Sequence, residues 1–106
     1  MDNAKLEALL AEATAHCYDE EEEFWGLCEA LLVRLSFPLE ARMQGEAVTL
    51  VGLDDQQSDL QKGVVARVRK GDQEQTVALT ELEVPNPDPV SAEWLAAYRY
   101  WLGKRG

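Results

Sequence analysis

Histidine and cysteine, on which many catalytic and metal sites depend, are scarce in this sequence. Its 106 residues include one histidine and two cysteines. Two cysteines cannot form the disulfide framework of a small secreted scaffold, and no Cys/His spacing typical of a zinc site is present. His16 and Cys17 are adjacent, so their side chains point in different directions and do not easily form a base and nucleophile pair. We therefore expect a protein that is not an enzyme, with Cys17 and Cys28 as buried thiols.

Long hydrophobic runs are also lacking. No apolar segment approaches the ~20 residues of a membrane-spanning helix, and no basic-then-apolar leader opens the chain. Hydrophobic residues still make up 46% of the sequence, which is enough to bury a core. The length suits one domain. These observations predict a folded, soluble, cytoplasmic protein.

Basic residues are too few to balance the acidic ones. The sequence has 20 acids and 10 bases, a formal charge of −10. The excess lies in the first 59 residues, which carry 14 acids and three bases. Such a half repels nucleic acids and anionic membranes, because affinity for both depends on Lys and Arg. We expect it to attract metal ions or basic proteins instead, unless the charge serves only solubility.

Helical periodicity marks both ends of the chain. Asp2 and Asn3 can cap a first helix, and a second helix follows the acidic run 18–23 and stops before Pro38. A last helix is expected from Ser91 to Gly103, after the proline-rich segment 85–89. Its aromatic residues recur at helical spacing and are expected in the core; they are Trp94, Tyr98 and Trp101.

Apolar and polar residues alternate in the middle of the chain, as in half-buried strands. The strands are expected at 39–44, 47–53 with a bulge at Gly52, 63–69 and 75–79, with 80–84 a short last strand or a helical turn. The order of elements predicts an α+β fold. We expect four or five short antiparallel strands to curl into a small SH3-like barrel flanked by the helices.

Acidic side chains gather at the start of the second helix. Asp19, Glu22 and Glu23 follow the i, i+3, i+4 spacing that sets side chains on one helix face, and Glu20 lies toward the core side. Their mutual repulsion falls if a divalent cation lies among them, and Ca²⁺ accepts six to eight oxygens in flexible geometry. The alternative is a solvated helix start that interacts favourably with the helix dipole.

A second acidic group lies in the polar loop after the second strand, at Asp54, Asp55 and Asp59. It does not form an EF-hand: from Asp54, the sixth position is not Gly and the twelfth is Val65 instead of Glu. A calcium site here would have to be assembled differently, from loop and helix together. The alternative is an ordinary turn-forming connector.

The chain resembles the small calcium-binding proteins first described in cyanobacteria and found widely in bacteria. The resemblance covers about residues 18–103 and rests on several segments in the same order. They are Tyr18-Asp19-Glu20 with Glu23, the stretch FPLEARMQGEAV from Phe37, Val51-Gly52-Leu53-Asp54, the strand Val65–Arg69, Leu79–Leu82, and Trp94–Trp101.

The resemblance implies calcium buffering or sequestration through acidic surface groups, without EF-hands. Asp19, Glu20, Glu23 and Asp54 match the family best, whereas Glu22, Asp55 and Asp59 are added on the physical argument alone. Residues 1–17 are then expected to be a helical extension and 18–106 the calcium-binding domain. The rival hypothesis is an SH3-like interaction module whose acidic face docks a basic protein. The small basic cluster of Arg67, Arg69 and Lys70 balances the acids, unless it marks a partner contact.

Overall fold

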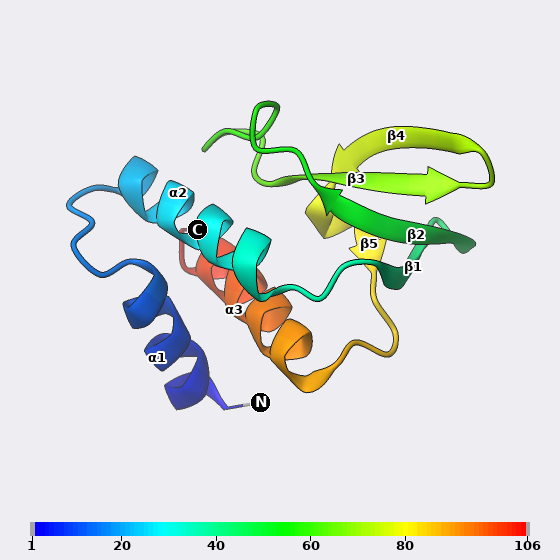
Figure 1. The fold of residues 1–106 in the computed structure, drawn as a ribbon. Coiled ribbons are helices and arrows are strands. Elements are labelled where there is room, and N and C mark those ends of the chain that lie inside the picture. The colour runs from blue at the N-terminus through cyan, green and yellow to red at the C-terminus, as the bar shows by residue number, and fades with distance from the viewer. Residues whose placement is uncertain (1, 106) are drawn as a thin grey trace. The chain divides into compact units, whose positions relative to one another are not determined.

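A computed structural model describes residues 2–105 of the chain. It divides into two compact units, each with its own internal contacts. Residues 2–35 with 88–105 form a helical unit, and residues 36–87 form a sheet unit. Figure 1 labels the elements of both, and each unit is described by itself.

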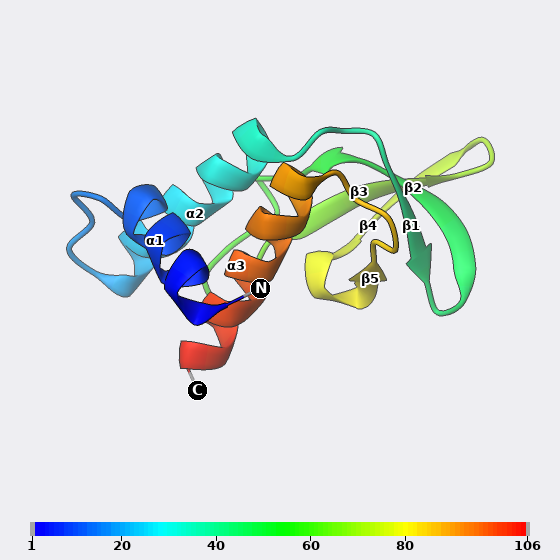
Figure 2. The ribbon, with the colours of Figure 1, turned by 90° about the horizontal axis from the view of Figure 1, so that it is seen from below.

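Three helices make up the helical unit: α1 (Asn3–Ala13), α2 (Glu20–Arg34) and α3 (Pro89–Arg105). They pack on one another, as both views of the ribbon show (Figures 1 and 2). The Asp2 carboxylate accepts the Lys5 backbone N–H at 2.8 Å, so the predicted cap of the first helix is confirmed. Helix α1 buries three leucines, Leu6, Leu9 and Leu10. Whether residues 1–17 form an extension separate from the domain stays a prediction.

Helix α3 supplies the aromatic core residues that its periodicity predicts. Trp94, Tyr98 and Trp101 are all buried, and the rings of Trp101 and Phe24 of α2 lie 6.3 Å apart. The predicted bounds of this helix were wrong at both ends. Asp88, not Ser91, provides the cap, accepting the Ser91 N–H at 3.1 Å, because Pro89 fits the first helical position. The helix also continues through Gly103.

Five antiparallel strands form the sheet unit, in the order β4-β3-β2-β1-β5. The predicted bulge at Gly52 is confirmed by the shift in register between Leu50 and Gly52. The short last segment contains both alternatives that the sequence left open, a 3-10 turn and a strand. The elements are β1 (Leu39–Met43), β2 (Glu46–Leu53), β3 (Val65–Lys70), β4 (Gln73–Ala78), η1 (Leu79–Glu81) and β5 (Leu82–Glu83).

The α+β class is confirmed, but the predicted SH3-like barrel is wrong, because the sheet is open. Strand β5 is two residues long and pairs with β1, and β4 pairs with β3, so the two outer strands do not meet within the described chain. The first four residues of β4 are exposed, as expected for an open edge. Alternating hydrophobicity is the same in an open and a closed sheet, so the sequence could not distinguish them.

No helix among residues 2–105 is long and apolar enough to cross a membrane.

Candidate metal centre

The acidic start of α2 is built around its own cap. Asp19 has an extended backbone, and its Oδ1 accepts the Glu22 N–H at 2.8 Å. Glu22 Oε2 in turn accepts the Tyr18 N–H at 2.9 Å. Both carboxylates therefore hold the first turn in place, near the positive end of the helix dipole. A carboxylate has about four lone-pair positions, so capping leaves each with further acceptor capacity.

Two other carboxylates of this turn contact the last turns of α3. Glu20 Oε1 pairs with the Arg105 Nε, and Glu23 Oε1 accepts the Trp101 indole N–H at 3.2 Å. The Arg105 guanidinium also lies over the Trp101 ring, 5.1 Å from its centroid. A hollow of about 490 Å³ opens here, with three of the predicted metal ligands in its wall. It is lined by Tyr18, Asp19, Glu20, Glu23, Trp101, Lys104 and Arg105.

The half-buried thiol of Cys17 responds to this negative charge. Its pKa is raised, first by burial and then by the charges of Glu22, Glu23 and Asp19. A raised pKa keeps the thiol protonated at neutral pH. The start of α2 is therefore a region of negative potential that disfavours a further anion and favours a cation.

The loop between β2 and β3 uses two of its three acids for turns. Asp54 accepts both the backbone N–H of Gln57, at 3.2 Å, and its side-chain amide, at 2.8 Å. Asp59 accepts the Lys62 N–H at 2.6 Å. These contacts are typical of Asx-turns, which the sequence offered as the alternative for this loop. Asp55 is exposed between them.

The seven predicted ligands are therefore found in two groups, one in each unit: Asp19, Glu20, Glu22 and Glu23, and Asp54, Asp55 and Asp59. Over residues 2–105, no three His, Cys, Asp or Glu side chains are close enough together to hold one metal ion. The oxygen donors have the chemistry that Ca²⁺ prefers, but carboxylates would have to turn from their present partners toward an ion. The ligand set stays a prediction.

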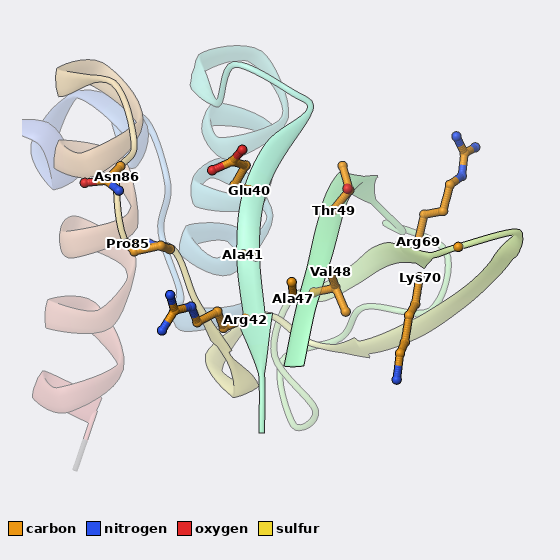
Figure 3. Close-up of a pocket in the computed structure, with 11 residues that line it drawn as sticks. Glu40, Ala41, Arg42, Ala47, Val48, Thr49, Arg69, Lys70, Pro85 and Asn86 are labelled. Atoms are coloured by element: carbon orange, nitrogen blue, oxygen red, sulfur yellow. The ribbon is translucent and has the colours of Figure 1, made fainter. Parts of the chain in front are cut away.

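The basic residues of the sheet unit do not converge either. A hollow of about 440 Å³ is lined by Arg42, Arg69 and Lys70, which point away from one another (Figure 3). Lys70 pairs with Glu46, and Arg69 contacts Glu74 at 2.8 Å and holds the pKa of that carboxyl below its usual range. Arg69 and Lys70 therefore each pair with a nearby acid. The role of the basic cluster of Arg67, Arg69 and Lys70 stays a prediction.

Sequence reasoning missed the cations that lie beside the acidic start of α2. Arg105 is 85 positions from its partner Glu20, and Lys104 is 97 positions from Glu7, which it contacts at 2.7 Å. Nothing in a single sequence shows such long-range pairs. The only available signal was the position of both cations in the last turn of a helix, where positive charges interact favourably with the helix dipole.

Comparison with known proteins identifies two solved structures with a similar fold. The fold is very similar to that in the crystal structure of Anabaena CcbP, with a TM-score of 0.83 at 23% identity over 96% of this chain and 91% of that one. A structure described as a calcium binding protein in the calcium-binding form gives a TM-score of 0.78 at 20% identity, over 98% and 93% of the two chains. At these identities the likeness concerns the fold. No curated protein matches the chain.

Three helices and an open antiparallel sheet define an α+β protein whose second helix begins with a run of acids. Residues 7–102 match the CcbP family, whose description is calcium binding, and the match covers most of the chain. The chain belongs to the CcbP family of calcium-binding proteins. The resemblance inferred from the sequence is thereby confirmed.

Proposed function

We propose that this protein is a non-enzymatic calcium buffer that sequesters Ca²⁺ in the cytoplasm. Family membership supports calcium as the ligand. The observation that supports the proposal further is that Asp19, Glu20 and Glu23 all line one hollow at the start of α2. Cys17 and Cys28 are not joined in a disulfide in the described chain, which is consistent with a reducing compartment.

The start of α2 is the proposed main binding region, and its candidate ligands are Asp19, Glu20, Glu22 and Glu23. Ca²⁺ tolerates irregular coordination, so a few carboxylates with water can hold it. The loop acids Asp54, Asp55 and Asp59 are proposed as a second region, in the sheet unit. Exposed, flexible sites of this kind bind with dissociation constants of roughly 10⁻⁶ to 10⁻³ M.

Calorimetric titration with Ca²⁺ and with Mg²⁺ tests this proposal. We expect heat of binding with Ca²⁺ and weaker binding of Mg²⁺, which demands a rigid octahedral geometry. Glu20→Gln and Glu23→Gln should each weaken Ca²⁺ binding several-fold. Glu21→Gln is the matched control, because Glu21 belongs to the same turn and carries the same charge but does not line the hollow.

Equal effects of the three substitutions would mean that only general charge matters and would contradict the proposed site. Asp55→Asn tests the loop region separately, because Asp55 is exposed while its neighbours hold turns. The absence of any preference for Ca²⁺ over Mg²⁺ would favour the rival hypothesis of an acidic module that docks a basic protein.

A further inference from the structure

Strand β4 is an open edge of the sheet unit (Figure 1). It pairs with β3 along its whole length, and no other strand among residues 2–105 pairs with it. Its first four residues are exposed. An edge strand of this kind presents a row of backbone N–H and C=O groups that can pair with another strand.

The features that protect most edge strands are lacking in β4. Proteins shorten or cover such strands, bend them with bulges, or place Lys and Pro in them. The opposite edge, β5, has two residues, whereas β4 has six, QEQTVA, without Lys, Pro or a shift in register. The one charge in β4 belongs to Glu74, which contacts Arg69 of β3 at 2.8 Å. The edge therefore carries little unbalanced charge that would repel a second strand.

The Ala78 N–H shows which residues of β4 face the open edge. It donates to Glu81 Oε2 at 3.3 Å, whereas the N–H of the next residue donates to the segment just before β3. Backbone groups of successive strand residues turn to alternate sides, so Glu74 and Thr76 face the open edge as Ala78 does. Because the Ala78 donor is already bonded, the edge that remains for pairing is 73–77.

We propose that β4 is a homodimer interface, at which two copies of this chain pair antiparallel about a two-fold axis at Gln75, the centre of this free edge. The register places Glu74 of each copy opposite Thr76 of the other. Both residues turn their N–H and C=O groups outward, so all four outward groups of each copy find partners. A contact of this kind is self-complementary and closes at two copies.

The charges favour this register over its neighbours. With the axis at Gln75, Gln73 of one copy lies opposite Val77 of the other, and no like charges are directly opposed. An axis one residue later would need the Ala78 N–H, which is already bonded. An axis one residue earlier would set the two Glu74 carboxylates opposite each other, which is destabilising.

The dimer should be weak. One pair of short strands buries less surface than a stable interface needs, and each copy carries a formal charge of −10. We expect dimers at millimolar protein and monomers at micromolar protein. Added NaCl should favour the dimer, because it screens the repulsion between the two copies. Sedimentation equilibrium over a series of protein and NaCl concentrations measures this.

The decisive experiment places charges at the two-fold axis. Gln75→Lys and Gln75→Glu each set like charges opposite each other in the homodimer, so each should weaken association about two- to five-fold. An equimolar mixture of the two variants sets opposite charges against each other and should restore association. Gln73→Lys and Gln73→Glu are the matched controls, because Gln73 is an exposed glutamine of the same strand that lies opposite Val77. Mixing the two control variants should give no comparable gain.

Disulfide trapping is a second measurement, suited to a weak dimer. In the proposed register Gln75 lies directly opposite its own counterpart, close enough for a disulfide, whereas the two Gln73 residues lie far apart. Gln75→Cys should therefore form a covalent dimer faster than Gln73→Cys on oxidation. The native thiols Cys17 and Cys28 are the same in both variants, so their contribution cancels.

Two results would overturn the inference. If the wild type stays monomeric at millimolar protein and Gln75→Cys cross-links no faster than Gln73→Cys, this edge does not pair. If a dimer forms but the variants at the two glutamines weaken it equally, or mixing does not restore it, the contact lies elsewhere. Circular dichroism of each variant checks that the fold is retained. None of these measurements involves calcium, so they test the dimer independently of the proposed function.

Discussion

The Glu7 carboxylate of α1 contacts two polar groups in the last turns of α3. Hydrogen bonds from Lys104 and from Tyr100 hold its pKa below the ordinary value of 4.5. The same contacts raise the pKa of the Tyr100 hydroxyl and of the Lys104 amine above their usual ranges, with the bond to Glu7 as the largest cause in each. The charged form of Glu7, neutral Tyr100 and charged Lys104 are therefore favoured in the folded state.

These pKa shifts predict how stability depends on pH. The contribution of Glu7 is present above pH 4.5 and is lost as the pH falls through its lowered folded pKa. The contributions of Tyr100 and Lys104 are present below their ordinary values of 10.0 and 10.5 and are lost as the pH rises through their raised pKa values. Glu7→Gln should therefore make the free energy of unfolding fall less steeply at both acidic and alkaline pH. Urea unfolding at a series of pH values measures this.

Glu12→Gln is the control for this prediction. It removes an equal charge from the same helix but leaves the contacts of Glu7 in place, since Glu12 pairs with Arg34 at 3.1 Å. The free energy of unfolding of this variant should fall at acidic and alkaline pH as steeply as that of the wild type. A Glu7→Gln variant whose stability falls with acid as steeply as the wild type would show that the contacts of Glu7 do not matter to folding.

At the scale of elements, the end of α1 approaches α2 so closely that only glycine fits at one position. A Cβ on Gly26 would lie 2.5 Å from the Ala13 backbone oxygen, whereas a Cβ on Gly103 of α3 would meet nothing within 4 Å. Alanine is favoured over glycine in a helix by about 1 kcal/mol. Gly103→Ala should therefore stabilise the protein by up to about 1 kcal/mol. Gly26→Ala should destabilise it by roughly 1–3 kcal/mol, because the backbone must shift.

Chemical unfolding of both variants measures the difference. If the two alanine substitutions stabilise the protein equally, α1 does not approach α2 closely enough to exclude a side chain at Gly26. The comparison separates packing from helix propensity. Propensity alone predicts that alanine stabilises the protein at both positions, whereas packing makes alanine destabilising at Gly26.

Local signals in the sequence were enough to predict most helices and strands. They failed for features that depend on contacts between residues distant in the chain. Alternation located β1 and β2, and a lone glycine located the bulge at Gly52. The start of α3 was misplaced because Ser91 and Asp88 are both good caps, and only the fit of Pro89 to the first turn decides between them. Barrel closure depends on which edges pair, which alternation does not encode.

The candidate site shows the same limit. Clustering of acids at Asp19–Glu23 was evident from the sequence, and the structure places three of them around one hollow. Their partners were not evident, because Trp101 and Arg105 lie some 80 residues away in the chain. The sequence therefore predicted the negative charge at the start of α2, and could not predict that Arg105 pairs with Glu20.

For the whole molecule, a charge of −10 on 106 residues means that calcium should stabilise the fold. A ligand that binds only the folded state adds RT ln(1 + [L]/Kd), which for 1 mM Ca²⁺ and the expected affinities is about 0.4 to 4 kcal/mol. A domain of this size gains roughly 4 °C or more in Tm per kcal/mol, so a rise of at least about 2 °C is expected.

Screening alone would also relieve repulsion among the acids, and the choice of salts separates it from binding. At matched ionic strength, NaCl and CaCl₂ screen surface charges to a similar degree, because screening depends on ionic strength. Site binding predicts that the Tm rises most in CaCl₂, less in MgCl₂ and least in NaCl, as scanning calorimetry can measure. The Glu20→Gln/Glu23→Gln double variant should lose much of the calcium-specific part while keeping the response to NaCl. Equal shifts in all three salts would mean that the acidic side chains are merely screened, and that the carboxylates at the start of α2 do not act together on one ion.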